Sequence, residues 1–123
     1  MNKNNNTTAS TLIRVTNAVT PYMAGQLTKE QWDEYEEDLI EGLSQFGTIL
    51  HHWFVTKDEK EICADPGNLF IEYESKKEAE KAMEEMQGRI YDERTISLYF
   101  VPRDLYYQNF KKNLTPPVLK DKN

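Results

Sequence analysis

The order in which strand-like and helix-like segments follow one another most restricts what this chain can fold into. Four segments show the alternation of a β-strand, in which successive side chains point to opposite faces. Two other segments place apolar residues three and four positions apart, as an amphipathic helix does. The strands are predicted at residues 12–17, 49–56, 68–73 and 95–101, and the helices at 29–46 and 75–88. The resulting order is strand, helix, strand, strand, helix, strand.

This β-α-β-β-α-β order predicts the ferredoxin-like plan, an α+β sandwich in which two helices cover one face of a four-stranded antiparallel sheet. A further short helix is expected at 104–110, over an edge or a face of the sheet. At 123 residues the chain suffices for one such domain, which we place at 11–110. The Asn- and Thr-rich segment 1–10 is predicted to be a disordered N-terminal tail, and the Lys- and Pro-containing segment 111–123 a flexible C-terminal tail.

The first predicted helix has two chemically different faces. Thr28 is a suitable N-cap, and five apolar residues after it fall within an arc of roughly 80°. This apolar stripe consists of Trp32, Tyr35, Leu39, Leu43 and Phe46. The opposite face carries the carboxylates of Glu30, Glu34, Glu37, Asp38 and Glu41. Because these carboxylates repel one another, an incoming cluster of Arg or Lys would stabilise them and steer its own approach.

The charge of the chain argues against a surface built for polyanions. Its formal net charge is −6, and residues 12–103 hold 19 acidic against 10 basic side chains, a balance of −9. Contacts to phosphate supply most of the non-specific affinity for nucleic acid, so an acidic domain starts with a repulsive field. RNA binding by this domain is therefore expected to be weak or absent.

The sequence shows no pattern that predicts catalysis, a cofactor or a metal site. Cys63 is the single cysteine and can form neither an internal disulfide nor a multi-thiolate site. His51 and His52 are neighbours on a predicted strand, so they point to opposite faces and cannot share one metal ion. No apolar run reaches the length of a signal or membrane segment, so we expect no membrane association. An enzyme is not expected.

The plan of this domain resembles the RNA recognition motif (RRM), whose two central strands stack bases on aromatic rings. At the stacking position of the first strand this chain has Arg14, and at that of the third strand it has Asn68. Phe70 remains, and Trp53 shares its face by strand parity. These four residues are the candidates for RNA binding, the alternative function. We expect the C-terminal segment to bury Phe70 and Trp53 instead.

Over residues 12–110 the chain also resembles the U2 auxiliary factor homology motif (UHM), a branch of the RRM fold in pre-mRNA splicing factors. The resemblance depends on a combination of four elements. They are the acidic helix Trp32-Asp33-Glu34-Tyr35-Glu36-Glu37-Asp38-Leu39, its end at Phe46-Gly47, the degenerate third strand Gly67-Asn68-Leu69-Phe70, and the loop Gly88-Arg89-Ile90-Tyr91.

The resemblance implies a peptide site. In the UHM family an Arg-x-Phe loop and the acidic first helix bind a Trp-containing peptide with basic flanks. Arg89, Ile90 and Tyr91 match that loop, with Tyr in place of Phe, so a ring able to stack on an indole is kept. The residues expected to bind the peptide are Glu34, Glu37, Asp38, Glu41, Arg89, Ile90 and Tyr91.

The resemblance further implies that the partner is another splicing factor and that the protein is nuclear. A likeness to the small subunit of the U2 auxiliary factor is weakened because its flanking zinc fingers need cysteines that this chain lacks. Gly42 stands where the family often has an acidic residue. Either the acidic face binds basic residues more weakly at that end of the helix, or the exposed backbone allows a ligand to approach closely. Self-association through the sheet is a third interpretation.

Overall fold

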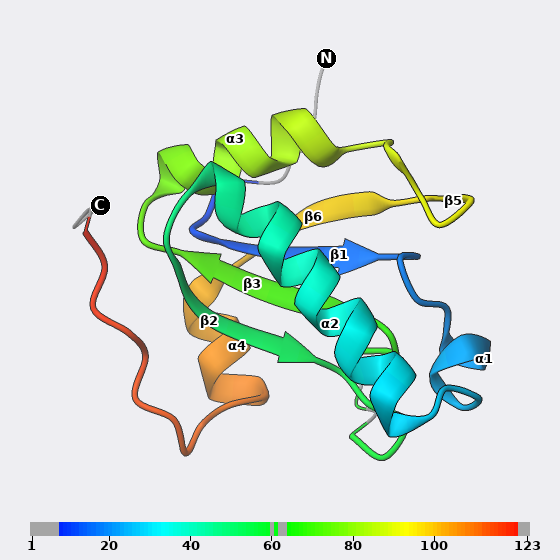
Figure 1. Ribbon diagram of the computed structural model, residues 1–123. Helices are drawn as coiled ribbons and strands as arrows, with labels where there is room; N and C mark the ends of the chain where they lie inside the picture. The colour runs from blue at the N-terminus through cyan, green and yellow to red at the C-terminus, as the bar shows by residue number, and fades with distance from the viewer. Residues whose placement is uncertain (1–7, 60, 62–63, 121–123) are drawn as a thin grey trace.

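The computed structural model describes residues 8–59, 61 and 64–120, and the ferredoxin-like prediction is confirmed (Figure 1). A four-stranded antiparallel sheet has the order β2-β3-β1-β6, and two long helices cover one of its faces. The strands are β1 (Leu12–Thr16), β2 (Ile49–Phe54), β3 (Leu69–Tyr73) and β6 (Ser97–Val101), and the helices are α2 (Lys29–Leu43) and α3 (Lys76–Met86). Cys63 and most of the predicted N-terminal tail lie outside the described residues.

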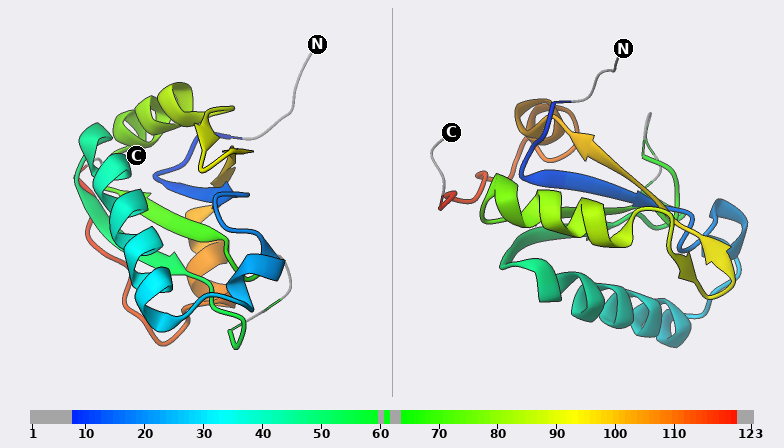
Figure 2. Two further views of the ribbon diagram at one scale, coloured as in Figure 1. Left: turned by 45° about the vertical axis from the view of Figure 1, so that its right-hand side comes forward. Right: turned by 90° about the horizontal axis from the view of Figure 1, so that it is seen from above.

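The sheet is buried on both faces. Alternate residues of β1 and β3, such as Ile13 and Ile71, contribute to a core beneath α2 and α3. The residues between them, such as Leu12 and Phe70, belong to a second apolar cluster on the opposite face. The helix that covers this second cluster is α4 (Arg103–Asn109), which lies across the sheet from α2 and α3 (Figure 2). The expected C-terminal helix therefore lies over the face and not only at an edge.

The long helices begin close to where the sequence places them. The Thr28 side chain accepts a hydrogen bond from the Gln31 backbone, and the Gln31 side chain accepts one from Thr28, which forms a reciprocal capping box. At the start of α3 a capping box is only half formed. Ser75 caps the helix, but the Glu78 carboxylate accepts from the backbone N–H of Glu74.

Two segments, 21–24 and 90–94, lie outside the predicted helices and strands but have regular structure. Thr20 caps a single helical turn, α1 (Pro21–Ala24), with proline at a position that needs no backbone donor. The segment that carries the Arg-x-aromatic motif is a two-stranded hairpin, β4 (Ile90–Tyr91) with β5 (Arg94–Thr95). Its turn residues Asp92 and Glu93 have φ angles of 48° and 71°. Positive φ at both turn positions matches the twist of a hairpin, but Asp-Glu lacks the Asn-Gly signal that would have predicted it.

The chain after α4 returns along the domain toward the start of α3 (Figure 1). The backbone N–H of Lys120 donates to the carbonyl of Glu74 at 3.0 Å, and the Arg103 guanidinium donates to the carbonyl of Pro117. The boundaries of the domain and the flexibility of its tails stay predictions. Among the described residues, no helix has the length and apolar character to cross a membrane.

Candidate functional site

On the face of the sheet that binds RNA in many RRMs, α4 covers the rings of Trp53 and Phe70. Phe70 is 1% exposed and Trp53 is 7% exposed. Their rings stack on each other with centroids 5.4 Å apart, and Tyr106 of α4 lies 5.1 Å from Phe70. Lys111 completes the cover, with its ammonium 3.8 Å from the centre of the Trp53 ring. The expectation that the C-terminal segment buries both rings is confirmed.

The two polar candidates on this face are occupied by contacts within the protein. Arg14 donates from Nε to Oδ1 of Asn68 at 2.9 Å, and its guanidinium lies 3.8 Å from the Asp65 carboxylate. The Asn68 side chain is buried and also accepts from the backbone N–H of Asp65. Of the four RNA candidates, three are thus buried and Arg14 is half-buried.

A buried carboxylate, which the sequence analysis did not single out, fixes α4 to the sheet. Glu72 is 0% exposed, and it accepts hydrogen bonds from Thr11, Arg103 and Tyr107 at 2.5, 2.5 and 2.6 Å. A buried charge is tolerated when a cation and further donors compensate for the lost water, and these three groups do so. Only strand parity with Phe70 could have placed Glu72 on this face.

A second polar contact between sheet and α4 involves a histidine. His51 lies 2.7 Å from the Tyr106 hydroxyl, and burial lowers the pKa of its imidazole to about 4. His52, its neighbour, points to the other face and contacts Glu36 of α2 at 3.3 Å. The prediction that the two histidines face apart is confirmed. Among the described residues no group of three or more His, Cys, Asp or Glu side chains is arranged to hold a metal ion.

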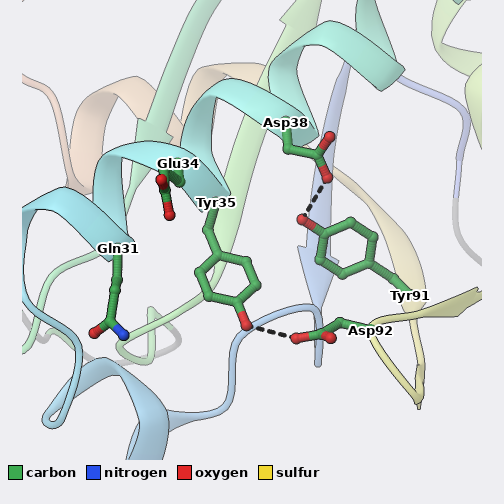
Figure 3. A pocket seen from close by; sticks show the side chains of 6 residues that line it. All are labelled: Gln31, Glu34, Tyr35, Asp38, Tyr91 and Asp92. Carbon is green, nitrogen blue, oxygen red and sulfur yellow. Dashed lines mark hydrogen bonds between the residues drawn. The ribbon is translucent and has the colours of Figure 1, made fainter.

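On the helical side, a hollow of about 590 Å³ opens between α2 and the β4–β5 hairpin. Its walls are polar and aromatic, and Figure 3 shows the side chains from both elements pointing toward one another. The lining residues are Gln31, Glu34, Tyr35 and Asp38 of α2 and Tyr91 and Asp92 of the hairpin.

Two hydrogen bonds of the same kind, but opposite direction, join the helix to the hairpin across this hollow (Figure 3). The Tyr91 hydroxyl of the hairpin donates to Asp38 of the helix at 2.8 Å. The Tyr35 hydroxyl of the helix donates to Asp92 of the hairpin at 2.5 Å. The two rings are 6.3 Å apart between centroids and tilted by 59°. We call these four residues the tyrosine–aspartate clamp.

The electrostatics of the clamp follow from its contacts. Burial and, next, the bond to Asp38 raise the pKa of the Tyr91 phenol. The bond to Asp92 raises the pKa of the Tyr35 phenol. The same bond, together with Arg94, lowers the pKa of the Asp92 carboxyl, because both donors favour its charged form. Both phenols thus stay protonated donors at neutral pH.

The hollow gathers some, but not all, of the residues predicted to bind a peptide. Glu34, Asp38 and Tyr91 line it. The others, Glu37, Glu41, Arg89 and Ile90, are exposed but do not line it. Three lining residues, Gln31, Tyr35 and Asp92, were not predicted as site residues. Tyr35 was assigned to the apolar stripe, and only the position of Asp92 directly after Tyr91 could have suggested it.

The fold and its surfaces define a small binding domain of the kind that recognises RNA or protein segments. The family model of the RNA recognition motif matches residues 32–97, which is 66 of the 123 residues. The chain therefore belongs to the RNA recognition motif family, whose domains are typically not enzymes. The matched region begins inside α2 and so does not include β1, the strand that carries Arg14. No curated protein matched the chain.

Proposed function

We propose that this domain is a UHM-type protein-interaction module, which binds a Trp-containing peptide with basic flanks from another pre-mRNA splicing factor in the nucleus. One observation carries the proposal. The rings of Trp53 and Phe70 on the sheet face are buried under α4, whereas the ring of Tyr91 borders an open acidic hollow. The surface available to a partner is therefore the helical side.

The chemistry of that side suits an indole with cationic neighbours. Tyr91 would stack on the indole, whose burial supplies most of the free energy of binding. Glu34 and Asp38 inside the hollow, and Glu37 and Glu41 beside it, would attract Arg or Lys residues of the peptide and set its direction. Arg89, which is exposed, would pair with the acidic helix or with the peptide backbone.

Calorimetric titration of a Trp peptide with Arg and Lys flanks tests the proposal. Tyr91→Ala is expected to lower the affinity at least about 30-fold, the scale of an aromatic hot spot of about 2 kcal/mol. The double change Glu34→Lys with Asp38→Lys is expected to lower it further, because it removes attraction and adds repulsion.

The matched control is the double change Glu80→Lys with Glu84→Lys, which alters the net charge equally on the exposed face of α3. It should leave most of the affinity intact. If the Tyr91 and Glu34/Asp38 variants bind as well as the unchanged protein, the site lies elsewhere.

RNA binding is the second candidate, and one observation favours it. At the β1–β6 edge, Tyr99 is directly opposite Arg14, so both point to the α4 side of the sheet, and Tyr99 is 53% exposed. A base could stack there without displacement of α4. Tight binding of oligouridine at low salt, lost on Tyr99→Ala and Arg14→Ala, would rank RNA above the peptide.

A further inference from the structure

We propose that the Tyr91 hydroxyl is an autoinhibitory contact of the peptide site. The hydroxyl donates a hydrogen bond to the Asp38 carboxylate, with which a cationic residue of the ligand would pair. The same bond keeps the Tyr91 ring against α2. A ligand must therefore displace this one hydrogen bond, and loss of the hydroxyl should strengthen binding. The inference rests on the proposed function and concerns how the same site is regulated.

The spacing of the two rings shows that the hollow is closed to a flat group between them. A ring inserted between two others needs about 3.5 Å on each side, or roughly 7 Å between the flanking rings. Tyr35 and Tyr91 are 6.3 Å apart and tilted by 59°, so they cannot sandwich an indole as they stand. One of the two rings must move when a ligand enters.

The contacts around the clamp indicate which ring moves. Asp92 accepts from Tyr35 and also from Arg94, whose guanidinium donates to the backbone carbonyls of Asn17 and Ala18. This half of the clamp is thus tied to the loop after β1. In the other half the Tyr91 ring packs against the core, but its one side-chain hydrogen bond is the bond to Asp38, and among the described residues Asp38 has no second side-chain partner. Release therefore occurs at Tyr91.

Charge gives the release its selectivity. A neutral phenol donates one hydrogen bond to Asp38, whereas an Arg or Lys of the ligand brings a full positive charge and more than one donor. A cation can therefore replace the phenol at Asp38, and an uncharged flank cannot do so equally well. The preference for indoles that have basic neighbours thus comes from the Asp38 carboxylate, which the displaced phenol leaves free to pair with a cation.

The experiment compares Tyr91→Phe with the unchanged protein, because this change removes the hydroxyl and keeps the ring. For the Trp peptide with Arg and Lys flanks, we expect affinity to rise about 3- to 10-fold, the scale of the net contribution of one ordinary hydrogen bond, because the bond to Asp38 is exposed to solvent. Tyr35→Phe is the matched control, because it removes the hydroxyl from the anchored half and should not raise affinity. A peptide with Gln in place of each Arg and Lys should bind more weakly to both proteins, and it should gain about the same factor from Tyr91→Phe, because either ligand must break the same hydrogen bond.

Hydrogen exchange of the β4–β5 amides in the free proteins adds a readout without ligand. Exchange should speed up in Tyr91→Phe if the hydroxyl holds the hairpin, and unchanged exchange would contradict the inference. Peptide binding by the unchanged protein with no gain in Tyr91→Phe overturns the inference alone. No binding by either protein overturns the proposed function and the inference with it.

Discussion

The two sides of this domain use aromatic rings in opposite ways. On the sheet side, Trp53 and Phe70 are buried under α4 and stabilise the fold. On the helical side, Tyr35 and Tyr91 lie at the rim of an open hollow, and their hydroxyls bind carboxylates. Rings that are packed and dry contribute to stability, and rings that border water and charge are available to a partner. The RRM fold by itself therefore does not provide a set of exposed rings for RNA.

The cover of the sheet is held by polar as well as apolar contacts. Glu72 joins Arg103 and Tyr107 of α4 to β3, and His51 contacts Tyr106. A buried carboxylate left without these donors would cost several kcal/mol, so α4 cannot lift from the sheet without a large penalty. The hairpin over the hollow, by contrast, is joined to α2 by two exposed hydrogen bonds. The helical side is therefore the more adaptable of the two.

The largest expected effect is a difference in stability between substitutions on the two sides. Phe70→Ala should lower the free energy of unfolding by about 3–5 kcal/mol, because it leaves a cavity beneath α4. Urea denaturation measures this loss. Tyr91→Ala, on the half-buried side, should cost only about 1 kcal/mol. Equal losses in the two variants would mean that α4 does not seal the sheet.

A smaller effect, from pH, tests the polar contacts beneath α4. The pKa of His51 is lowered from 6.5 to about 4 in the folded protein, so folding favours its neutral form. The contribution of His51 to the free energy of unfolding is therefore fully present above about pH 6.5, and it is lost as the pH falls toward 4. Because the side chain is only partly buried, we expect it to be worth roughly 1–2 kcal/mol.

The control for this pH effect is His51→Gln. Urea denaturation of both proteins at pH 7 and at pH 4.5 isolates the histidine, since the carboxylates that titrate in acid are common to both. The stability difference between the two proteins should shrink or reverse at the lower pH. A difference that does not change with pH would show that His51 is not buried as a neutral group.

The smallest effect concerns Gly42 on the helical side. Apart from its chain neighbours and the backbone of its own helix, no atom of the described residues lies within 4 Å of where its Cβ would be, so no other segment of the domain requires a bare backbone there. Gly42→Ala should therefore stabilise the protein by about 1 kcal/mol, measured by thermal or urea denaturation. Peptide affinity should stay the same. A clear loss of affinity would instead indicate that the ligand itself approaches the backbone at this position.

Much of the fold could be predicted because it follows from local rules. The strand alternation around Ile13 and Phe70, the cap at Thr28 and the apolar stripe of α2 each depend on residues close together in the sequence. The hairpin at Ile90–Thr95 was missed because Asp92 and Glu93 adopt positive φ without the glycine that usually signals it. The turn of helix at α1 was missed because it is too short to show a period.

The candidate site was harder to predict because its contacts join distant segments. Asp38 and Tyr91 are 53 positions apart, and Tyr35 and Asp92 are 57 apart. A single sequence marks Tyr91 by its motif and Asp38 by its helix face, but it does not reveal that they bind each other. Likewise, nothing near Glu72 in the sequence indicates that Arg103 and Tyr107 will compensate its charge.

By itself the sequence determined the β-α-β-β-α-β order, the acidic face of the first helix and the presence of Arg14 and Asn68 at two stacking positions, because periodicity and residue type are local properties. Only the tertiary structure decided that α4 covers Trp53 and Phe70, that Glu72 is buried and His51 partly buried beneath it, and that tyrosines and aspartates join the two sides of the hollow. The physical reason is that burial and charge compensation depend on which distant side chains meet in space, and the packing of the whole chain sets those meetings.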